Sequence, residues 1–179
     1  MKNKKCLIVL GSVLLFTGCG NSEMKDKGVD SLTFTNKYEC FRTENYTKYD
    51  IEHRNGGGIL TADEMKEKKN SPIVVEGKIS KIYDFNKEGS KLLAHYEIET
   101  YTYLIDVSMD EEKSVYEKKC SNSKEYGYKS CEVSVKDNVI TLIRTSDLDS
   151  EYNKDTVEKM TLDSIMNDYK NDEIYTCSN

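Results

Sequence analysis

The chain has 179 residues and a formal net charge of −6, and charged residues make up 32% of it against 37% hydrophobic. This length suits one domain with a modest core. The acidic balance argues against nucleic acid and anionic lipid headgroups as partners, because both repel a negatively charged surface.

The first nineteen residues have the pattern of an export signal that ends in a lipidation site. Three lysines precede an apolar run from Cys6 to Phe16, which is too short for a membrane-spanning helix. The next residues, Thr17, Gly18 and Cys19, resemble the lipobox that the lipoprotein signal peptidase cuts, with Phe16 where Leu is commonest. We therefore predict a signal peptide over 1–18 and lipid on Cys19. The alternatives are an ordinary secretory signal cleaved near Gly18 and an uncleaved anchor.

Residues 19–36 are polar and lack a periodic apolar pattern, which predicts a lipidated tether. Loss of the signal removes three lysines, so the exported chain has 23 basic and 32 acidic residues, a net charge of −9. More than one acyl chain would hold this chain stably on the extracytoplasmic face of the cell membrane.

Four cysteines remain on the exported side once Cys6 is removed and Cys19 is lipidated. They are Cys40, Cys120, Cys131 and Cys177. An even number in an oxidising compartment favours two disulfides, for which three pairings can be drawn. We favour Cys120–Cys131, which closes a short loop between a helix end and the next strand, and Cys40–Cys177, which ties the beginning of the domain to its end. Four free thiols are the alternative, and no Cys-x-x-Cys spacing indicates a metal.

Residues 37–179 are predicted to form a single domain, and its elements follow in chain order. Residues 37–52 favour one or two strands, and a glycine run at 56–58 breaks them. Capping-box patterns at Thr61–Glu64 and Ser108–Glu111 begin helices that extend to about Lys69 and Cys120. Strands are expected over 73–85, 92–105, 131–135 and 139–144. A last helix carries one apolar stripe, formed by Leu162, Ile165, Met166 and Tyr169.

Two hairpins, each followed by a helical segment, recur about 50 residues apart. This order predicts an α+β fold, an antiparallel sheet of hairpins with two or three helices packed on one face. The recurrence suggests a duplicated hairpin–helix unit.

The lipobox, the early Cys40, the hairpins and the closing Tyr175-Thr176-Cys177 together resemble small lipoproteins of Firmicutes and Mollicutes and are similar to the YehR-like family. The resemblance covers most of residues 37–179, and the sequence departs from the family pattern around His53–Pro72. It implies the same fold and a Cys40–Cys177 bond, and it implies no activity.

Motifs for catalysis are sparse. His53 and His95 lie far apart in the sequence without a metalloprotease context, and we expect both to be strand or loop residues. The glycines at 56–58 lack the following Lys-Ser/Thr of a phosphate-binding loop. We therefore predict no enzyme, no catalytic residue and no cofactor.

One acidic stretch has the oxygen spacing of a calcium loop. Its oxygen-bearing residues are Asp147, Asp149, Glu151, Asn153, Asp155 and Glu158. Tyr152 stands where the loop needs glycine, and a strand instead of a helix precedes it. We therefore favour an acidic loop that leads into a helix N-terminus and keep calcium as the alternative.

The function predicted from the sequence is a membrane-anchored binding or interaction module for an unknown protein or small ligand. An aromatic binding surface could be formed by Tyr96, Tyr101, Tyr103, Tyr126 and Tyr128, but we favour the interpretation that they are strand residues selected by codon bias and β-propensity. The alternative function is an envelope accessory protein that supports or inhibits a partner enzyme or transporter.

Overall fold

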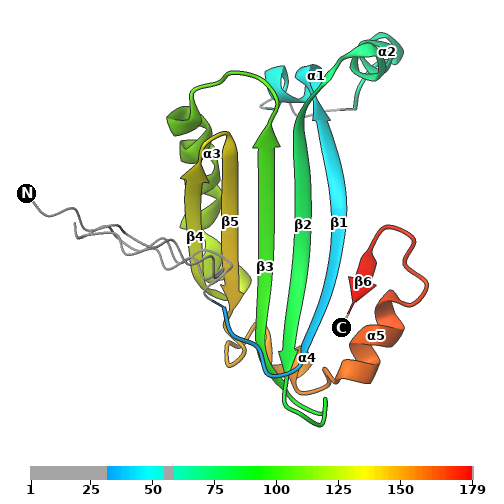
Figure 1. Cartoon of the computed structure of the whole chain (residues 1–179), viewed down its shortest axis with the longest axis vertical. Helices are drawn as coiled ribbons and strands as arrows, with labels where there is room; N and C mark the ends of the chain where they lie inside the picture. The colour runs from blue at the N-terminus through cyan, green and yellow to red at the C-terminus, as the bar shows by residue number, and fades with distance from the viewer. Residues whose placement is uncertain (1–31, 55–58, 179) are drawn as a thin grey trace, which may run out of the picture.

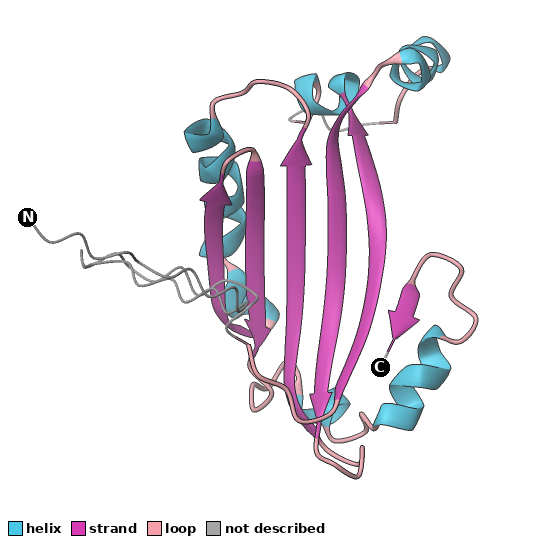
Figure 2. Cartoon of the chain, viewed as in Figure 1, coloured by secondary structure: helices cyan, strands magenta, loops and turns pink. Residues whose placement is uncertain are grey.

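The computed structural model describes residues 32–54 and 59–178, which form a sheet with helices along one face and at its ends (Figures 1 and 2). The predicted signal peptide, Cys19 and most of the tether lie outside the described residues. None of the helices described is long and apolar enough to cross a membrane.

The sheet has six strands, and every neighbouring pair is antiparallel. They are β1 (Lys37–Thr47), β2 (Ile73–Phe85), β3 (Leu92–Tyr103), β4 (Tyr128–Lys136), β5 (Val139–Ser146) and β6 (Thr176–Ser178). The spatial order is β4-β5-β3-β2-β1-β6, so β5 pairs with β3 and the short β6 lies along the outer side of β1 (Figure 1).

Two tight turns make the hairpins. The Asn86 side chain accepts hydrogen bonds from the backbone N–H groups of Ser90 and Lys91, and Gly89 takes a left-handed φ of 70° between β2 and β3. Between β4 and β5, Asp137 takes a φ of 54°, which a two-residue hairpin requires and which Asp tolerates. Both turns lie between the strands that the sequence predicts.

Helices connect the strands outside these hairpins. The helices α1 (Lys48–Glu52) and α2 (Ala62–Asn70) lie between β1 and β2 at one end of the sheet, and α3 (Met109–Ser121) packs on β4 and β5. After α3 comes the 3-10 helix η2 (Ser123–Tyr126). The helices α4 (Lys154–Val157) and α5 (Leu162–Tyr169) precede β6. The predicted α+β fold with an antiparallel sheet is confirmed, and a helix follows each predicted hairpin.

Several predicted boundaries differ from the structure by a few residues, and two of the differences change how a segment is assigned. Residues 48–52 are helical because Thr47 and Asp50 form a capping box that stops β1 and begins α1. The tether, predicted to extend to residue 36, ends earlier. The backbone N–H groups of Thr35 and Asn36 both donate to Asp84, at 2.7 and 2.9 Å, so this segment belongs to the domain.

Three groups of buried side chains make the core. The α5-side core lies between the sheet and α5 and comprises Tyr38, Cys40, Tyr83, Phe85, Leu92 and Ile165. The α3-side core lies beneath α3 and comprises Val74, Val75, Tyr101, Tyr103, Tyr116 and Ile140. A smaller group, Ile82, Ile98 and Ile143, lies on the opposite face under Leu32 and Phe34.

Two disulfides reinforce these layers. Cys40–Cys177 joins β1 to β6, with Cα atoms 4.1 Å apart, and Cys120–Cys131 joins the end of α3 to β4, with Cα atoms 5.4 Å apart. These are the two pairs favoured from the sequence. The first holds the chain end against the sheet edge, and the second holds α3 over β4 and β5.

Candidate functional site

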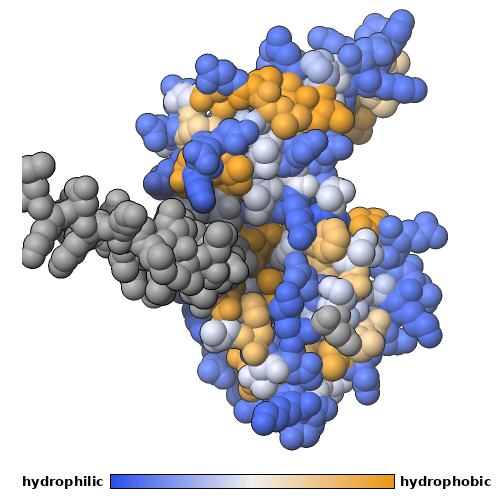
Figure 3. All heavy atoms as spheres, in the orientation of Figure 1, coloured by the Kyte–Doolittle hydropathy of each residue, from blue (hydrophilic) through white to orange (hydrophobic). Residues whose placement is uncertain are grey.

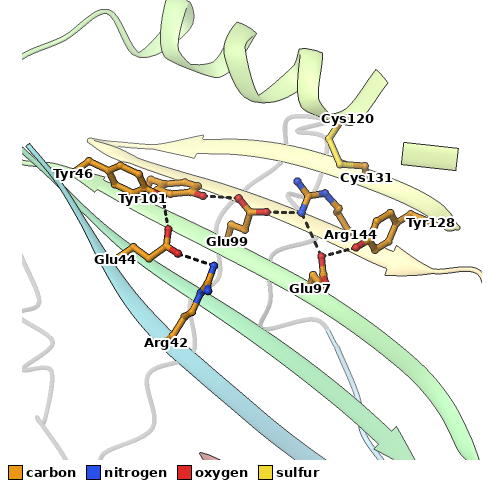
Figure 4. A network of polar contacts seen from close by, with 10 residues as sticks. All are labelled: Arg42, Glu44, Tyr46, Glu97, Glu99, Tyr101, Cys120, Tyr128, Cys131 and Arg144. Carbon is orange, nitrogen blue, oxygen red and sulfur yellow. Dashed lines mark hydrogen bonds and ion pairs between the residues drawn. A yellow bond between two sulfur atoms is a disulfide. The ribbon is translucent and has the colours of Figure 1, made fainter. Parts of the chain in front are cut away.

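A line of charged and aromatic side chains crosses the helix-covered face of the sheet between the α5-side and α3-side cores (Figure 4). We call it the polar strip, and its members are Arg42, Glu44, Tyr46, Glu97, Glu99, Tyr101, Tyr128 and Arg144. Strand alternation places these residues on one face, and the pairing of β3 with β5 sets Glu97 opposite Arg144.

Each glutamate of the strip contacts one tyrosine hydroxyl and one arginine guanidinium group. Glu44 binds the Tyr46 hydroxyl at 2.5 Å and the Arg42 Nη2 at 2.7 Å. The hydroxyls of Tyr101 and Tyr128 donate to Glu99 and Glu97, at 2.5 and 2.6 Å.

Arg144 connects the two glutamates of β3. Its Nη1 donates to Glu99 and lies 3.5 Å from Glu97. Burial opposes ionisation of Arg144, but Glu99 and Glu97 outweigh it and raise its pKa. Burial and the hydrogen bond to Glu99 raise the pKa of Tyr101, which stays a proton donor. The strip thus sets three carboxylates against two guanidinium groups in fixed geometry.

A cavity of about 490 Å³ opens beside the Arg144 end of the strip, and we call it the His95 cavity. Its lining includes His95, Glu97 and Arg144 from the sheet, and exposed Tyr126 and Tyr152 from the connecting segments. The α4 region adds an apolar wall formed by Leu148, Val157 and Met160. The volume is in the range that small ligands occupy.

His95 lines this cavity and is strongly perturbed by burial. Its ring stacks on Tyr83 with centroids 4.6 Å apart, and its Nδ1 lies 2.8 Å from the Ser146 hydroxyl. Burial lowers the pKa of His95 to about 4, so the ring is neutral at neutral pH. Nε2 is buried and has no hydrogen-bond partner among the described residues.

Gly127 fixes the rim between Tyr126 and Tyr152. Its carbonyl accepts hydrogen bonds from the Asn153 side chain at 2.7 Å and from the Asp147 backbone at 2.8 Å. Gly127 has a left-handed φ of 77°, and an added Cβ would lie 2.7 Å from the Asn153 side-chain nitrogen. Only glycine fits this position without strain, so the two rim segments hold each other in place.

A second cavity, of about 360 Å³, lies beneath α3, and we call it the Tyr116 cavity. Tyr46, Tyr101, Tyr103 and Tyr116 all contribute to its lining. Lys119 lines both cavities, and its ammonium lies 4.6 Å from the ring centroid of Tyr116 and 5.8 Å from that of Tyr101.

An ion pair closes one side of the Tyr116 cavity. Arg54 Nη1 lies 2.6 Å from Glu112, and the Tyr103 hydroxyl donates to the same carboxylate oxygen at 2.7 Å. Burial disfavours the charged form of Glu112, but Arg54 and Tyr103 outweigh it and hold its pKa below the ordinary value.

These geometries suit recognition better than proton transfer. The glutamates of the strip are already bonded to arginine and tyrosine. The Ser146–His95 pair lacks the third group that orients the base in a nucleophilic site, since Nε2 has no partner within the described part of the chain. Both cavities thus offer fixed donors, acceptors and aromatic faces.

The residues singled out in the sequence are separated by the fold. Tyr101, Tyr126 and Tyr128 reach the two cavities, and Tyr103 lines the second. Tyr96 instead lies on the opposite face, edge-on to Phe34. His53 stacks on Tyr49 at the end of α1, apart from His95.

The acidic stretch from Asp147 to Glu158 is not gathered around a common centre. In 32–54 and 59–178, no group of three or more His, Cys, Asp or Glu side chains is placed to hold a metal ion. Asn153, one of the candidate ligands, instead uses its side-chain nitrogen to hold the Gly127 and Asp147 carbonyls.

Arg144, Glu97, Glu99 and Lys119 were not anticipated as site residues. The one signal for them was the order Glu97-Ile98-Glu99-Thr100-Tyr101, which puts two acids and a tyrosine on the same side of a strand. Comparisons with known protein families, with curated proteins and with solved structures give no match.

Proposed function

We propose that this chain is an extracytoplasmic lipoprotein, anchored through lipid on Cys19, whose domain binds a small polar ligand in the His95 cavity without transforming it. The sequence of residues 1–19 supports the anchor, and two disulfides support an oxidising compartment. The relationship to YehR-like lipoproteins stays a prediction.

Unsatisfied buried atoms carry the binding proposal. Three buried side-chain nitrogen or oxygen atoms have no partner among the described residues, and two of them, His95 Nε2 and Ser123 Oγ, belong to residues that line the His95 cavity. Buried polar groups without partners are rare in folded proteins because each costs free energy. Both atoms are covered by neighbouring groups, so a ligand would satisfy them once a side chain of the cavity wall moves aside.

The rim and the wall define the ligand further. Tyr126 and Tyr152 are 60% and 68% exposed, so their rings are free to cover one face of a bound molecule. The α4 wall is apolar and the floor carries Glu97 and Arg144. This combination fits a molecule with one apolar face and several polar groups on the other.

Binding is tested by a thermal-shift screen of small polar compounds on the purified full chain. A ligand should raise Tm in a concentration-dependent way, and Tyr152→Ala should reduce the shift without lowering the Tm of the free protein. Ile174→Ala, at a position 66% exposed outside the cavity lining, serves as the control and should bind normally. Equal loss of binding in both variants would contradict the proposal.

Anchoring is tested separately by labelling cells with a radioactive or clickable palmitate. The wild-type chain should incorporate the label and Cys19→Ala should not. Cys6→Ala changes a cysteine in the apolar run and should label normally. Normal labelling of Cys19→Ala would refute the anchor.

One surface favours the accessory-protein alternative. Apolar residues gather at the end of the molecule where β2 begins and β3 ends (Figure 3), and there Ile73, Leu104 and Ile105 are 47%, 52% and 42% exposed. Crosslinking in the native envelope tests this alternative. Leu104→Asp should abolish the crosslink to a partner that docks on this surface and should leave ligand binding in the His95 cavity intact.

A further inference from the structure

We propose that the Tyr116 cavity is a subsite for a quaternary or fully methylated ammonium group, which takes the place of the Lys119 ammonium. The inference rests on the proposed binding function and names one chemical group of the ligand. The first evidence is the arrangement of three tyrosine rings. Tyr101 and Tyr116 have centroids 4.9 Å apart at 34°, and Tyr46 lies 5.9 Å from Tyr101 at 59°.

Tyr101 and Tyr116 are packed together and only 3% and 8% exposed, but one cation can still reach both rings, because the Lys119 ammonium lies 5.8 and 4.6 Å from their centroids. The negative face of an aromatic ring attracts a cation, and groups of aromatic rings are the usual receptors for quaternary ammonium groups. The cavity beside them measures about 360 Å³, enough for a tetramethylated nitrogen.

A cation of the chain itself already occupies this position. The Lys119 ammonium lies over the Tyr116 ring at 4.6 Å and within 5.8 Å of the Tyr101 centroid. Lys119 is exposed on the last turn of α3, so its side chain can move into solvent without disturbing the core. The rings therefore already contact a cation, and an exposed side chain carries it.

The balance of charges around the cavity also favours a cationic ligand. Four acids surround the rings, and each has its own basic partner: Glu44 with Arg42, Glu99 with Arg144, Glu112 with Arg54, and Asp50 with Lys68. Lys119 has no carboxylate within 4 Å among the described residues. Arg144 is also shared with Glu97, so the site becomes slightly acidic when Lys119 leaves.

Hydrogen-bonding capacity selects a methylated ammonium over a primary one. The hydroxyls of Tyr46, Tyr101 and Tyr103 already donate to Glu44, Glu99 and Glu112. A primary ammonium brings three donors that need acceptors to replace water, whereas a quaternary nitrogen has none and needs only the ring faces. An anion would meet the negative ring faces and is disfavoured.

The test is an amide chemical-shift titration of the full chain by NMR with tetramethylammonium chloride, against sodium chloride at equal ionic strength. Saturable shifts should appear in α3 and in β3 near Tyr101. Lys119→Met keeps most of the apolar stem and removes the internal cation, and it should tighten binding by about two- to fivefold.

Lys118→Met is the matched control, because it removes the same charge from the neighbouring residue, which lines neither cavity. Its affinity should equal that of the wild type. Tyr116→Leu should abolish saturable shifts, and an unchanged fold is checked by circular dichroism. If Tyr116→Leu does not fold, the comparison of Lys119→Met with Lys118→Met still tests the inference.

Three results would overturn the inference. The first is the absence of saturable shifts in both the wild type and Lys119→Met. The others are an equal gain in tetramethylammonium affinity in Lys118→Met and Lys119→Met, and shifts confined to another surface. If tetramethylammonium fails while a screened compound still binds in a Tyr152-dependent manner, the subsite is refuted and the proposed function stands. If that compound also fails, the proposed function is refuted as well.

Discussion

The two cores on the helix-covered face and the polar strip between them serve different ends. The α5-side core buries Phe85 completely, the α3-side core buries Ile140 completely, and the Cys40–Cys177 bond holds β6 beside the first. The His95 cavity borders the α5-side core through Leu92 and Val157, and the Tyr116 cavity borders the α3-side core. The cores form the closed side of this comparison, and the polar strip with its two cavities forms the open side.

This difference separates stability from binding. Apolar burial contributes free energy in proportion to area, so the closed side should dominate the stability of the domain. On the open side, buried charges gain little net stability because pairing must first offset their desolvation. A site of fixed, already paired groups therefore costs stability locally and needs a closed neighbour to support it.

Disulfide removal should show the largest contrast between the two sides. On the chain-entropy model, losing Cys40–Cys177 (C40S/C177S) should cost up to about 5 kcal/mol, and losing Cys120–Cys131 (C120S/C131S) up to about 3 kcal/mol. The reason is loop length, since the sequence separations are 137 and 11 residues. Urea unfolding measures both, and a larger loss for the shorter loop would contradict the comparison.

Truncating the closed core comes next. Phe85 is 0% exposed, so Phe85→Ala should lower the free energy of unfolding by about 3–5 kcal/mol through lost burial and the cavity left behind. Tyr116→Phe, in the lining of the Tyr116 cavity, removes only a hydroxyl and should cost clearly less. Chemical denaturation of the two variants measures both losses, and a greater loss for Tyr116→Phe would contradict the comparison.

The pH dependence of stability should show that His95 is buried in its neutral form. Burial lowers its pKa from 6.5 to about 4, so between these values the unfolded chain binds a proton that the folded chain does not. The stability attributable to neutral His95 is complete above pH 6.5 and falls by up to about 3 kcal/mol as the pH approaches 4. Subtracting the profile of His95→Gln from that of the wild type isolates this slope, and a flat difference would show that His95 is not buried as described.

The smallest effect should come from the rim. Gly127→Ala places a side chain at a left-handed φ and against Asn153, which should cost about 1–2 kcal/mol. Because the rim segments position Tyr126 and Tyr152, ligand affinity should fall as well. A thermal scan with and without ligand measures both quantities, and unchanged affinity would separate the rim from the site.

Much of the fold was predictable because its signals are local. A capping box at Thr61 and an N-cap hydrogen bond at Ser108 mark two helix starts, and the turns at Asn86 and Asp137 set the hairpins. The helix at 48–52 was missed because the aromatic and β-branched residues around Thr47 favour a strand, and the Thr47–Asp50 cap outweighs that preference.

There is a physical reason why the site could not be predicted from the sequence. Arg144 meets Glu97 only through the pairing of β3 with β5, which skips α3 and β4 in the sequence. Alternating glutamates on a strand are normally read as a solvent-facing side, and nothing local shows that tyrosines and an arginine cover them. Lys119 likewise becomes a site residue only when α3 is packed over β4 and β5.

The most direct test of the account is the tyrosine ring spectrum of the full chain, with carbon-labelled tyrosine, titrated with a compound that raises Tm in the screen. The ring signals of Tyr126, Tyr128 and Tyr152 should shift with saturation, because these residues line the His95 cavity. Those of Tyr169 and Tyr175, which pack against the α5-side core, should stay in place. Shifts confined to Tyr169 and Tyr175, which do not line the cavity, would contradict the assignment of binding to the His95 cavity.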